Sequence, residues 1–243
     1  MITKVILIGA GHYAATVFCY LDKSPDHEVE AFAVDPEFID TQTLCGRPVI
    51  SLTELTDLYP PSSVEIFCAV GPQKMNLYRM TLYERIRQWG YRFLTYIDPK
   101  AGTWPDLVVG QNVFIDDTCT IQPYVTIGDN VTLLASIVGH HGHIQDHAFL
   151  SRATLGGSVE IGEGTFIGMN ATIRDNTRVG SHCVVGMGAA VQQDIEDDTV
   201  VAAPKCRTVT LTKHRIQTIQ SSSTRLVKGI ANEHHTTDSS LYC

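Results

Sequence analysis

The sequence lacks the features of two large classes of protein. It has no clustered block of lysine and arginine, and its 18 basic and 26 acidic residues give a formal net charge of −8. It also has no uninterrupted apolar run of about 18 residues, the length that a membrane-spanning helix requires. These absences argue against a nucleic-acid-binding surface and a membrane span, so we expect neither nucleic acid nor a membrane as a partner.

Cysteine is present, but in no functional pattern. The seven cysteines are odd in number and scattered, and no two of them have the C-x-x-C spacing. We therefore expect neither a disulfide framework nor a thiolate zinc site. The first residues lack a cleavage-site pattern, so we expect no signal peptide and a cytoplasmic location.

The first hundred residues alternate strand-like and helix-like segments. The run KVILIG (residues 4–9) predicts a strand that ends in glycine, and residues 12–23 have apolar side chains at helical spacing. The turn between them, GAGHYA (residues 9–14), fits the G-x-G-x-x-[GA] pattern of dinucleotide-binding turns. Further strands are predicted over 64–71 and 92–98. This alternation predicts a Rossmann-like α/β domain with a parallel sheet over residues 1–98.

Small and acidic residues follow the ends of these predicted strands. Gly9 and Gly11 allow a tight turn that brings the amides of a helix N-terminus up to a phosphate. Asp35 ends the second strand, where its carboxylate can accept from a ribose or base, and Gly71 ends the third. A turn that only connects a strand to a helix is the alternative. Because the α/β unit is short for a dinucleotide fold, we predict a mononucleotide or nucleotide-sugar ligand.

From Val109 onward, aliphatic residues recur at every sixth position. One register covers residues 109–133, a second covers 155–191, and a short third register covers 138–150 between them. A six-residue period fits neither an α-helix nor an alternating strand. It is typical of a parallel β-helix in which each aliphatic side chain points inward. With three hexapeptides per coil, residues 109–191 predict roughly four to five coils.

The short middle register holds a cluster of histidines. The register slips by one residue before it, from 133 to 138, and again after it, from 150 to 155, and we expect these slips to push the backbone out of the regular prism. Uniform coils supply stability in a repeat protein, so the irregular coil is where we expect the functional site. The stretch SIVGHHGHIQDH (residues 136–147) carries His140, His141, His143 and His147.

This order of parts resembles the bacterial sugar acyltransferases of the sialic acid O-acetyltransferase type, and among them the nucleotide-amino-sugar N-acetyltransferases. The resemblance rests on the glycine-rich α/β region, the hexapeptide repeat, SIVGHHGHI and the later VVAAPK, and it covers roughly residues 3–207. It implies a left-handed β-helix over residues 99–207, acetyl-CoA as cosubstrate without a metal, and a homotrimer with active sites between subunits. Residues 208–243 extend past the resemblance and receive no role.

The resemblance also implies roles for single residues. His140 takes the place of the general base, and His141 takes the place of an acidic residue that orients it. Because a histidine cannot supply a carboxylate's negative charge, Asp146 is a candidate substitute. A UDP- or dTDP-linked amino sugar is expected at Gly9, Gly11, His12, Asp35 and Gly71, and acetyl-CoA is expected at Gly157, Met169, Met187 and Lys205, with Pro204 near its nucleotide end.

Three other functions stay open. A sugar O-acetyltransferase would need the base more, since an amine is already partly neutral near physiological pH. A zinc enzyme like the hexapeptide-repeat carbonic anhydrases would bind metal through His141, His143 and His147. A non-catalytic protein would bind a nucleotide sugar without depending on CoA. Otherwise we interpret His143 and His147 as structural polar groups, and His182 as a turn residue like His147.

Overall fold

The computed structural model describes residues 2–74 and 76–204, and Met1–Ala203 form one compact unit. Lys205 and the extension 208–243 lie outside the described residues. No helix among the described residues is long and apolar enough to cross a bilayer.

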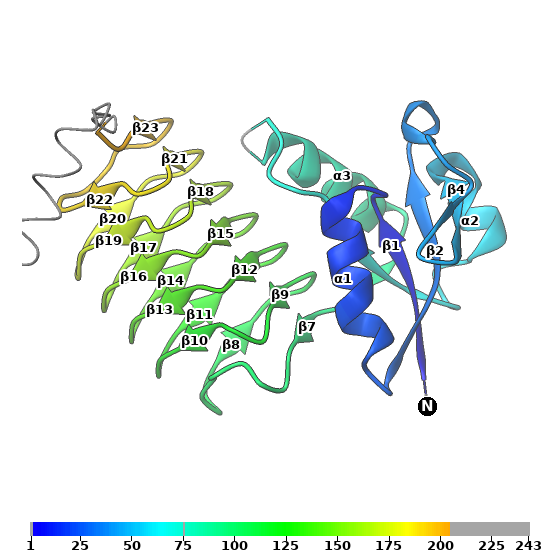
Figure 1. Cartoon of the computed structure of the whole chain (residues 1–243), viewed down its shortest axis with the longest axis horizontal. Coiled ribbons are helices and arrows are strands. Elements are labelled where there is room, and N and C mark those ends of the chain that lie inside the picture. Colours follow the sequence, from blue (N-terminus) through cyan, green and yellow to red (C-terminus); the bar gives the residue numbers. More distant parts are fainter. Residues whose placement is uncertain (1, 75, 205–243) are drawn as a thin grey trace, which may run out of the picture. The chain divides into compact units, whose positions relative to one another are not determined.

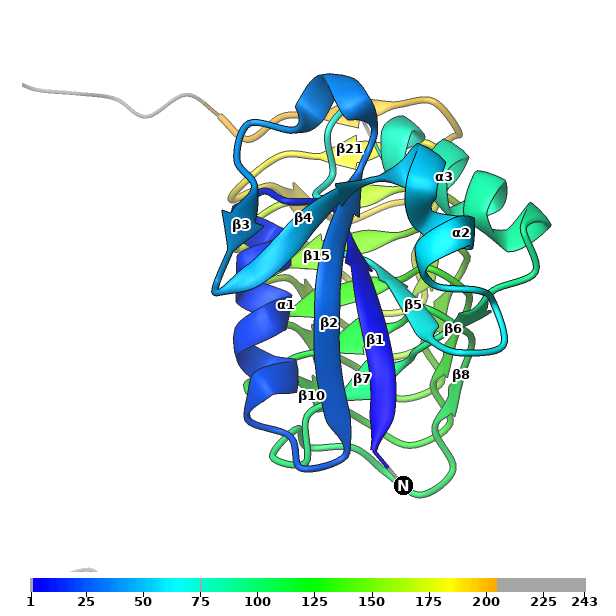
Figure 2. The same ribbon diagram turned by 90° about the vertical axis from the view of Figure 1, so that its right-hand side faces the viewer.

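The N-terminal region is built on a six-stranded sheet whose central strands are parallel (Figure 2). In spatial order its strands are β3 (Thr43–Leu44), β4 (Arg47–Ser51), β2 (His27–Val34), β1 (Thr3–Ile8), β5 (Glu65–Cys68) and β6 (Arg92–Phe93). Only β3 runs antiparallel to its neighbour. The helices are α1 (His12–Asp22), α2 (Leu55–Leu58) and α3 (Leu77–Gln88), with single 3-10 turns at Pro36–Phe38 and Leu52–Glu54.

Apolar side chains cover both faces of this sheet. The last four residues of β1 are all buried, as expected for a central parallel strand with packing on both sides. Helix α1 buries Ala14, Val17, Phe18 and Leu21, which share one face because they follow the i, i+3, i+4, i+7 spacing. Two separate hydrophobic clusters result, one on each face of the sheet. The α/β interpretation of this region therefore agrees with the observed order of elements.

The rest of the unit is a parallel β-helix of short strands in three sheets (Figure 1). The first sheet contains β7 (Tyr96–Ile97), β9 (Phe114–Ile115), β12 (Thr132–Leu134), β15 (Phe149–Ser151), β18 (Phe166–Ile167), β21 (Val184–Val185) and β23 (Val200–Val201). The second contains β10 (Thr120–Ile121), β13 (Ile137–Val138), β16 (Thr154–Leu155), β19 (Thr172–Ile173) and β22 (Ala190–Val191). The third contains β8 (Val108–Val109), β11 (Thr126–Ile127), β14 (His143–Ile144), β17 (Glu160–Ile161) and β20 (Arg178–Val179). The aliphatic residues of the repeat form one buried core, which confirms the β-helix.

The strand predicted over 92–98 is two strands instead of one. Residues Arg92–Phe93 pair with β5 in the N-terminal sheet, whereas Tyr96–Ile97 pair with β9 of the β-helix. The chain changes sheets at the two residues between them. A continuous apolar run cannot report such a change, because both halves are buried in either sheet.

The register slips do not distort the prism, and that expectation was wrong. Ile115 pairs with Leu133, 18 positions on, and Leu133 pairs with Leu150, 17 positions on, so the sheets stay in register across the short coil. Each slip removes one residue from a corner, where Ala135 and Arg152 adopt left-handed φ values of 47° and 49°. The inward positions are preserved because stacking of the buried aliphatic side chains fixes the strands and leaves the corners to absorb the deletion.

Candidate active site

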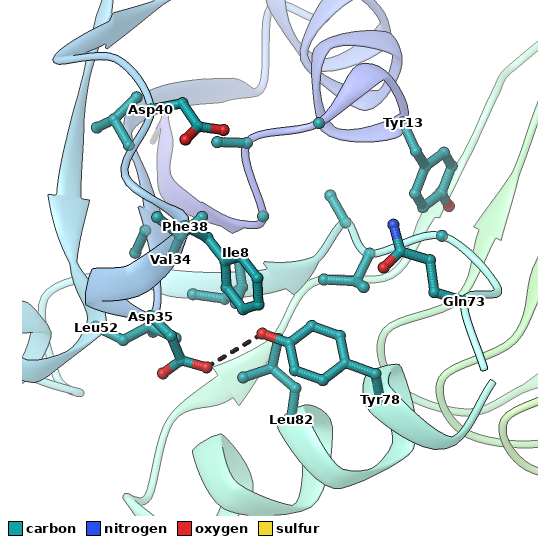
Figure 3. Close-up of a pocket in the computed structure, with 18 of the residues that line it drawn as sticks. Ile8, Tyr13, Val34, Asp35, Phe38, Asp40, Leu52, Gln73, Tyr78 and Leu82 are labelled. Carbon is teal, nitrogen blue, oxygen red and sulfur yellow. Dashed lines mark hydrogen bonds between the residues drawn. The ribbon is translucent and has the colours of Figure 1, made fainter.

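A cavity of about 450 Å³ opens at the carboxyl edge of β1, β2 and β5 (Figure 3). The carboxyl ends of parallel strands meet at one edge of a sheet, which is where ligands of open α/β sheets bind. All five residues predicted to bind the substrate line this cavity: Gly9, Gly11, His12, Asp35 and Gly71.

The two glycines of the GAGHYA turn serve different purposes. Gly9 has φ +117°, and a Cβ there would lie 2.7 Å from the carbonyl oxygen of Ala69, so this position requires glycine. Gly11 is the N-cap of α1 with φ −89°, and a Cβ there would meet nothing within 4 Å. Only the first glycine is therefore explained by the backbone of this chain; the second leaves the N-terminus of α1 uncovered.

Asp35 already has two partners inside the protein. The Tyr78 hydroxyl donates to its Oδ2 at 3.1 Å, and Arg85 Nη2 lies 2.7 Å from its Oδ1. Burial, with the Asp35 carboxylate beside it, raises the pKa of Tyr78 to about 12, so the phenol stays protonated and donates. Asp35 thus anchors α3 to the cavity wall, in addition to any contact with a ligand.

Sequence reasoning missed two aromatic residues of the cavity. The Phe38 ring lies 5.9 Å from that of Tyr78, edge to face, and both line the cavity (Figure 3). Phe38 is 51% exposed, so its ring is available to a ligand in the cavity. The signal in the sequence was an aromatic residue three positions after Asp35, just past a predicted strand end.

His140 and His141 lie on the corner between β13 and β14, and both are exposed. We call this corner, formed by residues 122–124, 139–141, 156–158 and 174–176 of successive coils, the histidine corner. The Nδ1 atoms of His140 and His141 are 3.1 Å apart, and the two rings are nearly perpendicular at 88°. The backbone N–H of His140 donates to Gln122 Oε1 at 3.0 Å, which ties its backbone to the coil before it.

The His140 ring lies against Gly157 of the next coil. A Cβ at Gly157 would lie 2.5 Å from His140 Cε1 and 2.7 Å from its Nε2. No side chain other than hydrogen fits there without displacing the ring. Gly157, predicted at the acetyl-CoA site, therefore lies beside the predicted base.

Within one chain, the three histidines of the zinc hypothesis do not converge. His141 contacts His140, His143 bonds to Thr126, and His147 is buried at a different corner, where its Nδ1 accepts from Asn130 Nδ2 at 2.8 Å. Within the described ranges, no three His, Cys, Asp or Glu side chains group closely enough to hold a metal ion.

Asp146 is not an acidic partner of His140 in this chain. Its Oδ1 accepts from the backbone N–H of Asp129 at 2.7 Å, at the corner between the third and first sheets. This is a turn contact between coils, and it leaves His140 and His141 without a carboxylate from this residue.

His147 is a turn residue with a structural role, as predicted. It has φ 64° and stacks at one corner with Asn112, Asn130, Gly164 and His182, all of which have left-handed φ. Its pKa is lowered, first by burial and then by the positive charge of Arg79. The neutral ring can therefore accept the hydrogen bond from Asn130.

This lowered pKa predicts acid sensitivity. Folding favours the neutral His147 ring, so the unfolded chain binds more protons once the pH falls below the ordinary histidine pKa of about 6.5. Its contribution to stability is complete above that pH and is lost as the pH falls. We expect a lower urea midpoint at about pH 5.5 than at about pH 7.5, and a smaller difference in His147→Asn, since asparagine already occupies this corner at Asn112 and Asn130. An equal pH dependence in both proteins would contradict this assignment.

The predicted acetyl-CoA residues lie at two corners of the β-helix. Gly157 belongs to the histidine corner, whereas Met169 and Met187 follow β18 and β21 at the corner between the first and second sheets. The two methionines are 43% and 65% exposed, and Gly188 N–H donates to Met169 O, so they stack in successive coils. Pro204 is the last described residue, and Lys205 lies beyond it.

The cavity and the histidine corner belong to different parts of the chain. Every residue that lines the cavity lies between Ile8 and Leu82, and none comes from the β-helix. The histidine corner joins the second and third sheets, whereas the N-terminal region packs on the first sheet through Phe114 and Tyr96. One chain therefore presents two separate half-sites.

Comparisons with known proteins agree with this architecture. A family model described as the GMPPB C-terminal domain matches residues 94–201. Over 108 residues the chain is 30% identical to the acyl-[acyl-carrier-protein]–UDP-N-acetylglucosamine O-acyltransferase of Burkholderia mallei (strain SAVP1). The matched stretch covers 41% of this chain and 41% of that protein. The chain thus spans less than half the length of this curated relative.

Two solved structures resemble nearly all of the described chain. The acetyltransferase domain of PglB from Neisseria gonorrhoeae FA1090, in complex with acetyl coenzyme A, is 27% identical, with a TM-score of 0.75 and coverage of 86% of this chain and 100% of that one. A histidine-to-alanine mutant of GDP-perosamine N-acetyltransferase from Caulobacter crescentus, in complex with CoA and GDP-perosamine, is 25% identical, with a TM-score of 0.75 and coverage of 86% and 99%.

Proposed function

We propose that this chain, like the hexapeptide-repeat sugar acyltransferases that it resembles, transfers an acetyl group from acetyl-CoA to the amine of a nucleotide-linked amino sugar. In this proposal the Rossmann-like residues 1–98 bind the nucleotide sugar, and the left-handed β-helix of residues 99–207 carries the transfer. The cytoplasmic location predicted from the sequence is part of the proposal, and the five described cysteines are free.

One observation carries the proposal: His140 presents its ring at an exposed corner, beside a glycine whose missing side chain makes room for that ring. A general base must reach the proton that it removes, and a solvent-exposed imidazole at a coil corner can meet that requirement. The two substrate complexes among the similar structures support the choice of acetyl-CoA and a nucleotide sugar.

The reaction then needs one bond made and one broken. The amine nitrogen attacks the thioester carbonyl carbon, and the carbon–sulfur bond breaks as the tetrahedral intermediate collapses. His140 Nε2 accepts the proton that the nitrogen loses, and the proton is available for the leaving thiolate. The products are the N-acetyl sugar nucleotide and the free thiol of CoA, so atoms and charges balance.

We also propose that the working unit is a homotrimer. The cavity and the histidine corner are separate half-sites in one chain, and Gly157 and Met169 lie at different corners. A neighbouring copy that brings its own corner and cavity alongside would complete both the acetyl-CoA groove and the sugar site. Three copies around an axis along the β-helix provide three equivalent sites.

The test is acetyl transfer by the purified full chain. UDP-, dTDP- and GDP-linked amino sugars are each incubated with acetyl-CoA, and release of the CoA thiol and the acetylated sugar is measured. We expect turnover with at least one of them. Binding of the nucleotide sugar without any dependence on CoA would contradict the proposal and favour a non-catalytic binding protein.

Phe38 provides a test of the cavity. Phe38→Ala removes an exposed ring that lines the cavity, so we expect KM for the nucleotide sugar to rise about tenfold, with KM for acetyl-CoA unchanged. Leu58→Ala is the matched control, because Leu58 is 55% exposed and does not line the cavity. Equal changes in both variants would show that the nucleotide binds elsewhere.

A further inference from the structure

The hydrogen bond between His140 and His141 can have its proton on either ring. Two Nδ1 atoms 3.1 Å apart form a hydrogen bond only when one of them carries the proton and the other offers a lone pair. If His141 donated, the neutral His140 ring would carry its own proton on Nε2, and Nε2 could not accept another. If His140 donates, its Nε2 is free to accept.

We propose that His141 is a positioning residue: an uncharged histidine that accepts the Nδ1–H of His140 and so keeps His140 Nε2 unprotonated and directed over Gly157. This inference rests on the proposed function of His140 as the base. It assigns to a neutral ring the work that a carboxylate does in a histidine–acid pair.

The surroundings hold His141 in this position. Its backbone has φ 57°, and its N–H donates to Pro123 O at 3.0 Å, so its Cα is fixed to the preceding coil. The ring of Tyr124, which occupies the equivalent corner position of that coil with φ 64°, packs against the His141 ring at 4.7 Å. The ring therefore lies between Tyr124 and His140, and its exposed position lets Nε2–H donate to water.

The chemical consequence concerns the acceptor that the enzyme acetylates. A carboxylate would stabilise the imidazolium of His140 by charge as well as by hydrogen bonding, and charge-assisted bonds are about twice as strong as neutral ones. His141 supplies the hydrogen bond alone. Such a base suits an amine, whose lone pair attacks before the proton leaves, better than a hydroxyl, which needs its proton removed during the attack.

The substitutions that test this use the left-handed backbone of position 141. Glycine and asparagine both adopt such a φ readily, so His141→Gly removes the acceptor and His141→Asn restores a neutral one through Oδ1, with little difference in backbone strain. We expect His141→Gly to lower kcat about tenfold, the most that one neutral hydrogen bond contributes, with KM for both substrates unchanged. His141→Asn should recover most of kcat, and His141→Asp should equal or exceed the wild type.

Three results would overturn the proposal. Equal loss of kcat in His141→Gly and His141→Asn would show that a hydrogen-bond acceptor at position 141 is irrelevant. Wild-type kcat in His141→Gly would do the same, and a rise in KM at constant kcat would make His141 a substrate contact. In a His140→Asn background, His141→Gly should have no further effect on kcat, because a positioning residue acts only through the residue that it positions.

A second measurement needs no turnover. The 15N chemical shifts of the two rings in the full-length, unliganded protein report which nitrogens carry protons. At about pH 8 we expect Nδ1–H on His140 and Nε2–H on His141. The reverse tautomers would refute the proposal even in an active enzyme, whereas these tautomers in a protein that acetylates nothing would reject the proposed function and keep the proton assignment.

Discussion

Replacement of His140 by asparagine is expected to lower kcat for acetyl transfer by about 10²-fold or more, with little change in KM for either substrate. General bases contribute roughly 10²- to 10⁴-fold, and His140 is the exposed ring whose Nε2 lies over the bare backbone of Gly157. Steady-state kinetics with the best nucleotide sugar measures this loss. Residual activity should rise with pH, because an amine with a pKa near about 8 loses its proton to water without help.

His143→Asn is the matched control for this experiment. His143 is also exposed and lies three residues further on, but it bonds to Thr126 and not to His140 or His141. We expect its kcat within about twofold of wild type, as for a surface substitution away from the reacting groups. A comparable loss in both variants, or full activity in His140→Asn, would remove His140 from the mechanism. A complete loss in His140→Asn at every pH would instead favour a hydroxyl acceptor.

Replacement of Arg79 by methionine is expected to lower the free energy of unfolding by about 3 kcal/mol. Arg79 is fully buried on α3, yet it donates Nη1 to His147 O at 2.9 Å and Nη2 to Asn130 Oδ1 at 3.1 Å and Thr132 Oγ1 at 3.2 Å. Burial lowers its pKa to about 10, which still leaves the guanidinium charged at neutral pH. Methionine removes a costly buried charge, but it also leaves His147 O without this donor, at about 1–3 kcal/mol for an unsatisfied buried acceptor. In contrast, Asn130 Oδ1 keeps its bond from Asn112 and Thr132 Oγ1 its bond to Tyr13.

Urea unfolding followed by circular dichroism, at one protomer concentration, measures this difference. Arg87→Met on the same helix is the control, because Arg87 is exposed and pairs with Glu84 at i,i+3. We expect its effect to stay within about 0.5 kcal/mol. If Arg79→Met were as stable as wild type, the removal of the buried charge would fully offset the lost hydrogen bonds, and the contact between α3 and the β-helix would be held by apolar packing alone.

Arg79 shows where the sequence was uninformative. A charged residue in an amphipathic helix is normally placed on the solvent face, and nothing near it in the chain indicates otherwise. Its acceptors are 51 to 68 positions away. Burial of the guanidinium becomes favourable only when α3 docks against the corner of the β-helix that carries Asn130 and His147, and no local pattern encodes that docking.

The sequence was informative about only part of the histidine cluster. The spacing of aliphatic residues located the coil, and the resemblance to the sugar acyltransferases singled out His140 within it. The separation of four neighbouring histidines into an exposed pair, a strand residue bonded to Thr126 and a buried corner residue came from the structure. The reason is geometric: the strand residues of this coil pair with residues 17 positions away in the neighbouring coils, so their partners are set by the register between coils.

The sequence by itself determined the β-helix and the position of the cavity. Both follow from local rules, because a six-residue period has only one way to bury its aliphatic side chains, and glycine-ended parallel strands share one edge. The tertiary structure alone decided that Asp35 is held by Arg85 and Tyr78, that Gly157 makes room for His140, and that the cavity and the histidine corner are apart in one chain. Those outcomes depend on contacts between distant segments, whose geometry is fixed only when the sheets and coils pack together.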